Sequence, residues 1–206
     1  FFSTENENLH SAAWYSNLKA KNINKIDCDI IHLHWIQGGT LSVKEIGKLN
    51  KPIVWTLHDM WPFSGAEHYS NGSLRYRDGY NSNNRPEGEI GFDLNRWTWK
   101  RKLKAWSKIK NLTIVAPSNW MAECARQSVL FVGRRIEVIH VGLDHNLYRP
   151  RNKDIIRELL DFPPDKKIIL IGAMNFLKDK RKGGFLLKEG FKRLAKDGHQ
   201  KDSIIY

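Results

Sequence analysis

The 206-residue chain carries 34 lysine and arginine residues against 22 acidic residues, which gives a formal net charge of +12. This excess favours anionic partners such as nucleic acid, phosphorylated small molecules or an acidic membrane surface, without choosing among them. The two cysteines, Cys28 and Cys124, match neither a disulfide framework nor a zinc motif, so a reducing compartment is expected. No apolar run approaches the roughly 18 residues of a membrane-spanning helix.

The first part of the chain is predicted to form a strand, a helix and a second strand. A short helix is expected before them, at residues 9–21. The first strand covers residues 29–36, Thr40 or Ser42 then caps a helix, and residues 52–57 form an unbroken apolar strand. This order implies two parallel strands joined by a right-handed crossover.

Residues 64–91 lose this periodicity and are rich in glycine, asparagine, serine, arginine and tyrosine, which predicts a long functional or mobile loop. Asp93 then caps a helix that extends to about residue 110. We expect an apolar stripe of this helix to pack on the sheet. Its basic residues, Lys102 among them, are expected to lie in water, where they could attract acidic lipid.

The remaining elements continue the alternation of strands and helices. A domain boundary is predicted near Pro150, which separates residues 1–149 from residues 150–206. Ser118 is predicted to cap a helix. The other predicted elements are strands at 112–116, 135–140 and 167–173, helices at 154–160 and 184–196, and a strand that begins at 203–206.

A polar pair, His58 and Asp59, follows directly after the strand at 52–57. Open α/β sheets bind ligands at the carboxyl ends of their strands. A histidine there can exchange protons near neutral pH or hold a sugar hydroxyl; it can equally be a structural residue bonded to the backbone. His34 could line the same cleft. His32 and His34 share a strand face, but no cysteine or carboxylate completes a metal site with them.

A second cluster of interest is basic and precedes Gly183-Gly184 at the start of a predicted helix. Cations beside the backbone N–H groups of a helix start suit a phosphate. The alternative is a solvated basic loop, and none of the common phosphate-loop motifs is present. The cluster consists of Lys178, Lys180, Arg181 and Lys182.

Five segments of the chain, taken in order, resemble glycosyltransferase family 4, in particular bacterial members that build surface polysaccharides. The resemblance runs from about residue 29 to residue 194, and the order and spacing of the segments carry it. They are IIHLHW at 30–35, WTLHDMWPFSG at 55–65, IVAPSNWM at 114–121, VIHVGLD at 138–144 and KRKG at 180–183.

The resemblance implies an α/β fold of the GT-B type, with two Rossmann-like domains built on parallel sheets flanked by helices. The first domain, incomplete at its start, would bind the acceptor, and the second, truncated here, would bind a nucleotide-sugar donor. Both ends of the chain therefore suggest a fragment. The predicted site residues are His58 and Asp59 for catalysis, His34 and Trp61 for the acceptor, and Arg181 and Lys182 for the donor phosphates.

The function expected from the resemblance is a retaining glycosyltransferase of surface polysaccharide synthesis with a saccharide or lipid-linked acceptor. No metal or cofactor is expected, because the nucleotide-sugar is a substrate. The protein would be cytoplasmic and able to contact an anionic membrane at its inner face. The alternative is a non-catalytic domain that binds sugars or anions. Nucleic-acid binding is not expected, because Trp35 and Trp55 lie within apolar strands.

Two departures from the family pattern are visible. Val141 stands where the family usually has asparagine, and the loop after His58-Asp59, from Ala66 onward, lacks the cysteines that close relatives often carry.

Overall fold

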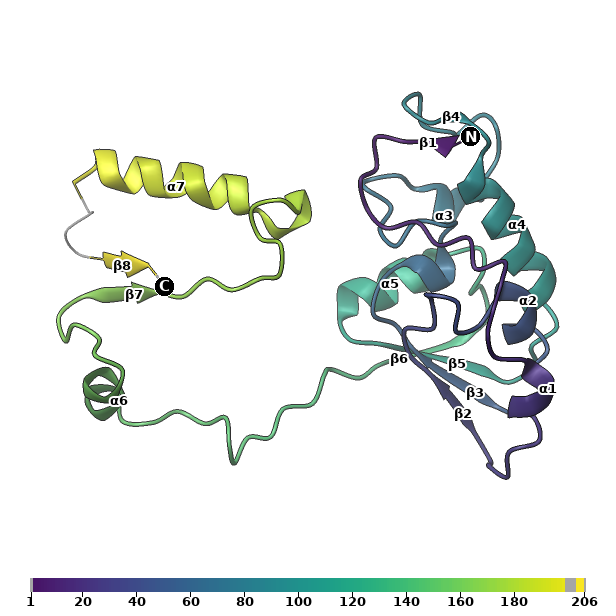
Figure 1. The fold of residues 1–206 in the computed structure, drawn as a ribbon, viewed down its shortest axis with the longest axis horizontal. Coiled ribbons are helices and arrows are strands. Elements are labelled where there is room, and N and C mark those ends of the chain that lie inside the picture. Colours follow the sequence, from purple (N-terminus) through teal and green to yellow (C-terminus); the bar gives the residue numbers. More distant parts are fainter. Residues whose placement is uncertain (1, 199–202, 206) are drawn as a thin grey trace. The chain divides into compact units, whose positions relative to one another are not determined.

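The computed structural model describes residues 2–198 and 203–205 and divides the chain into two compact units (Figure 1). The first unit is Phe1–Gly142 and the second is Leu143–Tyr206. The predicted domain boundary between residues 149 and 150 lies slightly further along the chain and stays a prediction.

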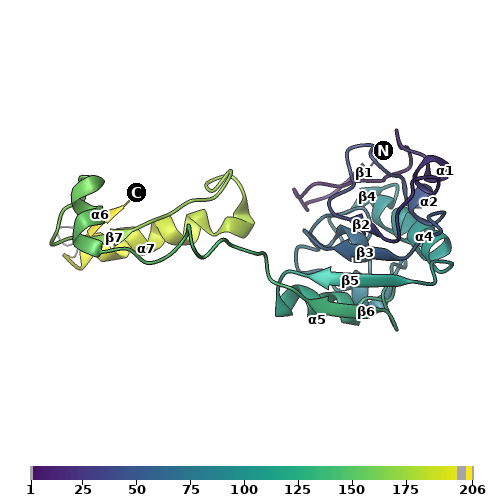
Figure 2. The same ribbon diagram turned by 90° about the horizontal axis from the view of Figure 1, so that it is seen from below.

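The first unit is organised around a sheet of four parallel strands in the order β2-β3-β5-β6 (Figure 2). Each strand lies within a predicted strand, because runs of β-branched, aliphatic and aromatic residues favour this conformation. The parallel sheet flanked by helices confirms the predicted α/β, Rossmann-like fold. The strands are β2 (Ile31–Leu33), β3 (Ile53–Thr56), β5 (Leu112–Ala116) and β6 (Arg135–Val138).

Side-chain caps start three helices of this unit, α2, α4 and α5, where the sequence predicted them. Ser42, Asp93 and Ser118 each accept a hydrogen bond from a backbone N–H in the first turn. Helix α2 packs against α4, and α5 packs against β5 and β6. The helices are α1 (Ala20–Ile23), α2 (Val43–Ile46), α4 (Leu94–Trp106) and α5 (Asn119–Gln127).

The predicted helix at residues 9–21 is wrong, because most of this segment is extended and only α1 is helical. Tertiary pairing takes the place of the helical hydrogen bonds. The Ser11 N–H donates to the Ala66 carbonyl at 2.7 Å, and the His68 N–H donates to the Leu9 carbonyl at 2.9 Å. Backbone groups satisfied in this way have no need of a helix.

Residues 64–91 form a structured loop around buried polar side chains, which include Arg75 and Tyr80. Its regular elements are short. They are η1 (Trp61–Phe63) just before it, α3 (Arg75–Asp78), and β4 (Ile90–Gly91), which pairs with β1 (Phe2–Ser3) in antiparallel fashion.

The core beneath the sheet contains three tryptophans in mutual contact. The ring centroids of Trp55 and Trp106 lie 5.3 Å apart, and those of Trp61 and Trp106 lie 6.0 Å apart, both pairs edge to face. Such pairs add specific geometry to a large buried apolar area. This cluster links β3 to η1 and α4, and so supports the chain just after β3.

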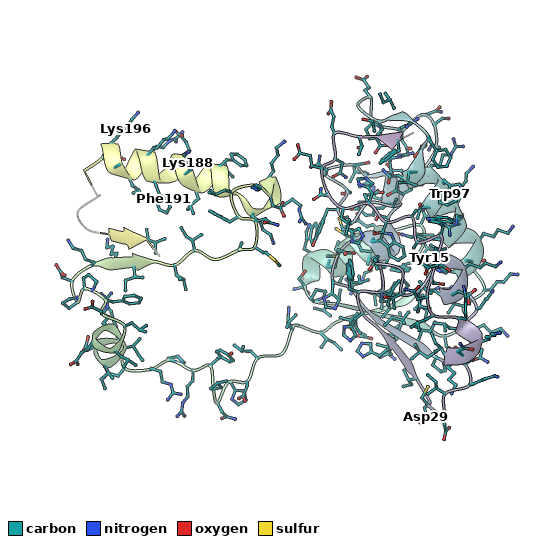
Figure 3. All side chains as sticks on the ribbon, viewed as in Figure 1. Tyr15, Asp29, Trp97, Lys188, Phe191 and Lys196 are labelled. Carbon is teal, nitrogen blue, oxygen red and sulfur yellow. The ribbon has the colours of Figure 1, made fainter. Side chains whose placement is uncertain are left out.

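The second unit pairs β7 in parallel with β8 and carries one long helix, α7. Phe191 of α7, labelled in Figure 3, lines an apolar groove of about 420 Å³ together with Ile171. The predicted strand at 203–206 is present except for Tyr206, which lies outside the described residues. The elements are α6 (Lys153–Leu159), β7 (Lys167–Ile169), η2 (Lys180–Lys182), α7 (Gly184–Lys196) and β8 (Ser203–Ile205).

Candidate functional site

The carboxyl ends of β2 and β3 bring two histidines together. Leu33 pairs with Trp55 in the parallel ladder, so His34 and His58 each lie just beyond the end of their strand on the same edge of the sheet. Nδ1 of His34 lies 3.0 Å from Nε2 of His58, and both side chains are exposed. One of these nitrogens must carry the shared proton and the other must accept it. The predicted proximity of His34 and His58 is therefore present in the structure.

A third histidine extends this pair along β2. The His32 ring lies 4.3 Å from the His34 ring, and its Nε2 lies 2.8 Å from Thr56 Oγ1. Burial lowers the pKa of His32, and charge on His34 lowers it further. We call His32, His34 and His58 the histidine row. Because the row is exposed and its members are hydrogen bonded, it can present ring nitrogens to a polar ligand.

Asp59 points the other way from His58 and is only 6% exposed. Its Oδ1 accepts a hydrogen bond from the Trp61 N–H at 2.9 Å, and its Oδ2 accepts one from Trp35 Nε1 at 3.1 Å. Nδ1 of His68 also lies 2.6 Å from Oδ2. A carboxylate with its lone pairs occupied in this way shapes the turn after β3. The structure thus gives Asp59, predicted as catalytic, the position of a residue that orients its neighbours.

Trp61, predicted to contact the acceptor, has no exposed surface. Its Nε1 donates to the Ser11 carbonyl at 2.7 Å, and Ser11 Oγ lies 2.8 Å from His68 Nε2. A fully buried indole cannot touch a bound acceptor. The assignment is therefore corrected: Trp61 is a core residue that ties the extended segment at residues 9–19 to the turn that holds Asp59.

The sequence predicted that Lys102 lies in water, and this prediction is wrong. The Lys102 side chain is fully buried beside the turn that follows β3. Its Nζ donates to the carbonyls of Trp61, Ser64 and Gly65, the last at 2.7 Å, and lies 3.6 Å from the centre of the Trp61 ring. Burial lowers the pKa of Lys102 well below its ordinary value. Its spacing was a usable signal, because residues 99, 102 and 106 lie on one face of a helix.

A second buried pair, Glu67 and Tyr80, supports the same turn. The Tyr80 hydroxyl donates to Glu67 Oε1 and accepts from the Gly65 N–H at 2.8 Å. Burial raises the pKa of Glu67, and burial together with the nearby carboxyl raises that of Tyr80. No sequence pattern predicted this pair. We call Asp59, Trp61, Glu67, Tyr80 and Lys102 the buried support of the site.

The predicted donor-phosphate residues lie in the second unit, within η2. Arg181 forms an ion pair with Asp179 at 2.6 Å, and this contact lowers the pKa of Asp179. Lys182 is exposed and precedes Gly183, whose φ of 69° leads into α7. Arg181 and Lys182 thus form a basic turn at a helix start, and their role toward a donor stays a prediction.

Two further properties concern the described residues as a whole. Within residues 2–198 and 203–205, no three histidine, cysteine or acidic side chains are arranged to hold a metal ion, the histidine row included. In the same part of the chain, no helix has the length and apolar character needed to span a membrane.

Comparison with known proteins adds one finding. The family model described as Glycosyltransferase Family 4 matches residues 1–147, which include the histidine row and the buried support. Searches of curated proteins and of solved structures found no match. Since the match covers most of the chain, the protein belongs to glycosyltransferase family 4.

Proposed function

We propose that this protein is a retaining glycosyltransferase of surface polysaccharide synthesis, which moves a sugar from a nucleotide-sugar to a saccharide or lipid-linked acceptor. Family membership supports sugar transfer in general. The observation that favours a catalytic role is the exposed ring of His58 at the carboxyl end of β3, held by His34 at 3.0 Å. Ligands of open α/β sheets bind at this edge.

Each part of the site would have a separate task in this reaction. His58 would hold a hydroxyl or exchange a proton beside the transferred sugar, and His34 would orient the His58 ring. Asp59 would stabilise the turn after β3 through its buried hydrogen bonds. Arg181 and Lys182 would stabilise the negative charge of the departing nucleotide diphosphate. This scheme uses only side chains of this protein and requires no metal or cofactor.

The test is release of nucleotide from a panel of UDP-, GDP- and ADP-sugars by the native protein, with and without candidate acceptors. We expect His58→Ala to reduce release at least about 100-fold, the lower range of an acid–base contribution. His145→Ala is the control with the same change of side chain, because this exposed histidine lies outside the histidine row. We expect it to stay within about threefold of wild type, since ordinary exposed substitutions have small effects.

A non-catalytic domain that binds sugars or anions is the competing function. It predicts that a nucleotide-sugar binds to the native protein without turnover. Equal nucleotide release by wild type and by His58→Ala would reject the catalytic role of His58, whether or not the protein transfers sugar. Saturable binding without any release would favour the competing function.

We further propose that the protein works in the cytoplasm at an anionic membrane surface, which it contacts through α4. Between Asp93 and Lys110 the sequence has no acidic residue, and Trp97, Lys100 and Lys104 of α4 are exposed. Trp97 also stacks under the Arg101 guanidinium, 4.3 Å from the ring centre. Exposed aromatic and basic side chains on one helix suit an acidic lipid surface.

Vesicle sedimentation tests this contact. We expect binding to phosphatidylglycerol vesicles, little binding to phosphatidylcholine, and a loss of at least about fivefold in Lys100→Glu/Lys104→Glu, on the basis of about 1 kcal/mol per basic residue near the surface. Lys188→Glu/Lys196→Glu on α7, labelled in Figure 3, is the control with the same charge change. If both double variants lose binding equally, net charge alone explains it and α4 is not the contact.

A further inference from the structure

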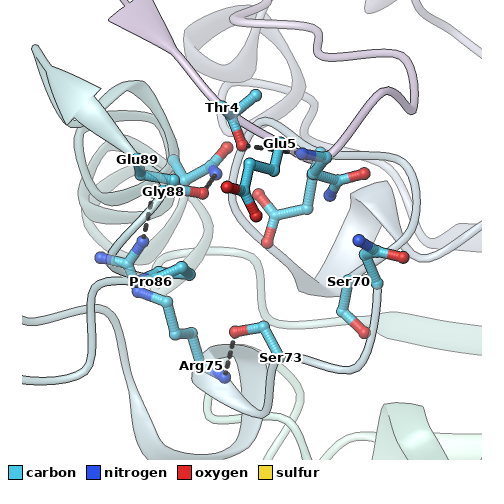
Figure 4. A pocket seen from close by; sticks show the side chains of 12 residues that line it. Thr4, Glu5, Ser70, Ser73, Arg75, Pro86, Gly88 and Glu89 are labelled. Atoms are coloured by element: carbon cyan, nitrogen blue, oxygen red, sulfur yellow. Dashed lines mark hydrogen bonds and ion pairs between the residues drawn. The ribbon is translucent and has the colours of Figure 1, made fainter.

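A polar cavity lies where the amino-terminal segment crosses the loop that follows η1 (Figure 4). Its volume is about 190 Å³. Pockets for larger drug-like ligands are roughly 300–1,000 Å³, so this cavity suits one small molecule of about the size of a single sugar ring. Its walls come from residues 4–6, residues 67–75, residues 86–89 and the start of α4.

The lining is almost entirely polar. Six neutral side chains with hydroxyl or amide groups contribute to it, alongside Arg75 and three carboxylates. Hydroxyl and amide groups both donate and accept hydrogen bonds, which matches a ligand rich in hydroxyls. The six neutral residues are Thr4, Asn6, Ser70, Asn71, Ser73 and Asn95.

The charge of the lining is negative, although the chain as a whole is strongly basic. Arg75 bonds to Glu89 at 3.3 Å and to Asp93 at 2.7 Å, so its positive charge is already balanced within the protein. Of the other two carboxyl groups of the lining, the exposed Glu5 adds negative charge, whereas Glu67, whose pKa burial raises, contributes mainly hydrogen-bond acceptors. The cavity therefore favours a ligand group that is positively charged.

Glu67 gives independent support, because it is 3% exposed and one of its oxygens lacks a partner. Tyr80 donates to Oε1, whereas Oε2 is buried and has no hydrogen-bond partner among the described residues. A buried acceptor left unpaired costs free energy that a donor from a ligand would recover. An ammonium group brings three such donors together with a positive charge.

The cavity is connected to the histidine row by short links. Asn6 Nδ2 donates to the Tyr69 carbonyl at 2.9 Å, and the Tyr69 hydroxyl donates to the His58 carbonyl at 3.5 Å. On the other side, Glu67 is followed directly by His68, which contacts Asp59. A ligand in the cavity would thus lie beside the turn that carries His58.

From these observations we propose that the cavity binds one amine-bearing sugar residue, a hexosamine with a free ammonium group, as a part of the acceptor. Glu67 and Glu5 would receive the ammonium group, and the neutral amides and hydroxyls would receive the ring hydroxyls. The assignment to the acceptor rests on the proposed transferase function, whereas the binding site itself can be tested without any transfer.

The test is a titration of the ¹⁵N-labelled full chain followed by NMR, with glucosamine, glucose and glucuronate as probes of similar size. Glucosamine should shift the backbone amides of Asn71, Ser73 and Gly88 in a saturable way. We expect glucose to bind at least about tenfold more weakly, because it lacks the charge-assisted hydrogen bond. Glucuronate should not bind, since its carboxylate would face the carboxylates of the cavity.

Variants identify the groups responsible. Glu67→Gln should weaken glucosamine binding about tenfold, and Glu5→Gln about threefold because Glu5 is exposed. Glu5→Gln also tests the site without disturbing the buried Tyr80 contact. Glu87→Gln is the matched control, because Glu87 is exposed in the same loop and does not line the cavity.

The outcomes separate the two proposals. Equal binding of the three sugars, shifts outside the cavity, or identical binding by Glu5→Gln, Glu67→Gln and Glu87→Gln would overturn the inference. Sugar transfer by the native protein without glucosamine binding would overturn this inference alone. Cavity binding of glucosamine by a protein that transfers no sugar would support the site and reject the transferase function.

Discussion

The histidine row and the buried support lie on opposite sides of the same strand ends. His58 and Asp59 are consecutive, yet the His58 ring is exposed, whereas Asp59 is only 6% exposed. The His58 ring shares an exposed hydrogen bond with His34, and the His58 carbonyl accepts one from the Tyr69 hydroxyl. Asp59 has three partners and lies in a core that also contains the fully buried Lys102.

The two regions therefore differ in their roles: the buried support stabilises the fold around the site, whereas the histidine row is available to a ligand. Groups in the buried support replace water with fixed partners, so removal of one leaves its partners unsatisfied. Groups in the histidine row remain in contact with water, so their removal costs little stability. Variants of the two regions should therefore differ in what they change: folding for the buried support and ligand chemistry for the histidine row.

The largest effect is expected at Lys102. Lys102→Met keeps the length of the side chain but leaves three backbone carbonyls without their donor. We expect the free energy of unfolding to fall by about 3 kcal/mol or more, as for loss of a buried charged partner. Urea denaturation measures it. Lys100→Met, on the exposed face of α4, should change stability by less than about 0.5 kcal/mol, and equal losses in both variants would contradict the buried role of Lys102.

A smaller loss is expected for Asp59→Asn. The NH₂ group of the asparagine replaces either the oxygen that accepts from Trp35 Nε1 or the oxygen that accepts from the Trp61 N–H. Placing a donor against a donor should cost about 1–3 kcal/mol. Denaturation of Asp59→Asn beside Asp29→Asn, an exposed aspartate labelled in Figure 3, measures the difference. Wild-type stability in Asp59→Asn would show that the buried hydrogen bonds are dispensable.

A pH-dependent effect is expected from Glu67, whose pKa burial raises above its ordinary value of 4.5. The facing groups, the Tyr80 hydroxyl and the Lys102 charge, lower it only in part. The folded state therefore keeps this proton to a higher pH than the unfolded state. The free energy of unfolding should fall as pH rises from about 4.5 through the raised pKa of the folded state.

Glu67→Gln removes this contribution. Denaturation of wild type and Glu67→Gln at several pH values should show a shallower fall in the variant, and Glu87→Gln should follow wild type. Parallel pH profiles for all three proteins would mean that Glu67 does not hold its proton as inferred.

The smallest effect on stability is expected in the histidine row itself. His34→Ala removes an exposed hydrogen bond and should change the free energy of unfolding by less than about 0.5 kcal/mol. Nucleotide release should nevertheless fall, because the His58 ring loses the partner that orients it. A large loss of stability, or full activity in a stable variant, would remove the distinction between the two regions.

Local patterns predicted much of the fold. The four strands of the sheet follow apolar runs, and Ser42, Asp93 and Ser118 cap helices as expected, because a cap depends on residues only a few positions apart. The placement of His58 at a strand end was also predicted, since strand ends are visible where polar residues interrupt an apolar run.

The predictions that the structure contradicts depend on contacts between distant parts of the chain. Residues 9–19 are extended because Leu9 and Ser11 pair with the backbone around Ala66, more than 50 positions away. Lys102 is buried because the turn from Trp61 to Gly65 offers it three carbonyls, a feature that the charged residue alone does not reveal.

The sequence by itself thus determined the family, the parallel sheet and the strand ends that carry His34 and His58. Only the tertiary structure decided which polar residues face water and which support the site. The reason is physical: strand runs and caps follow from neighbouring residues, whereas burial of a charge depends on partners that folding brings from far along the chain. Asp59, Glu67 and Lys102 owe their positions to such partners, and so does the cavity beside them.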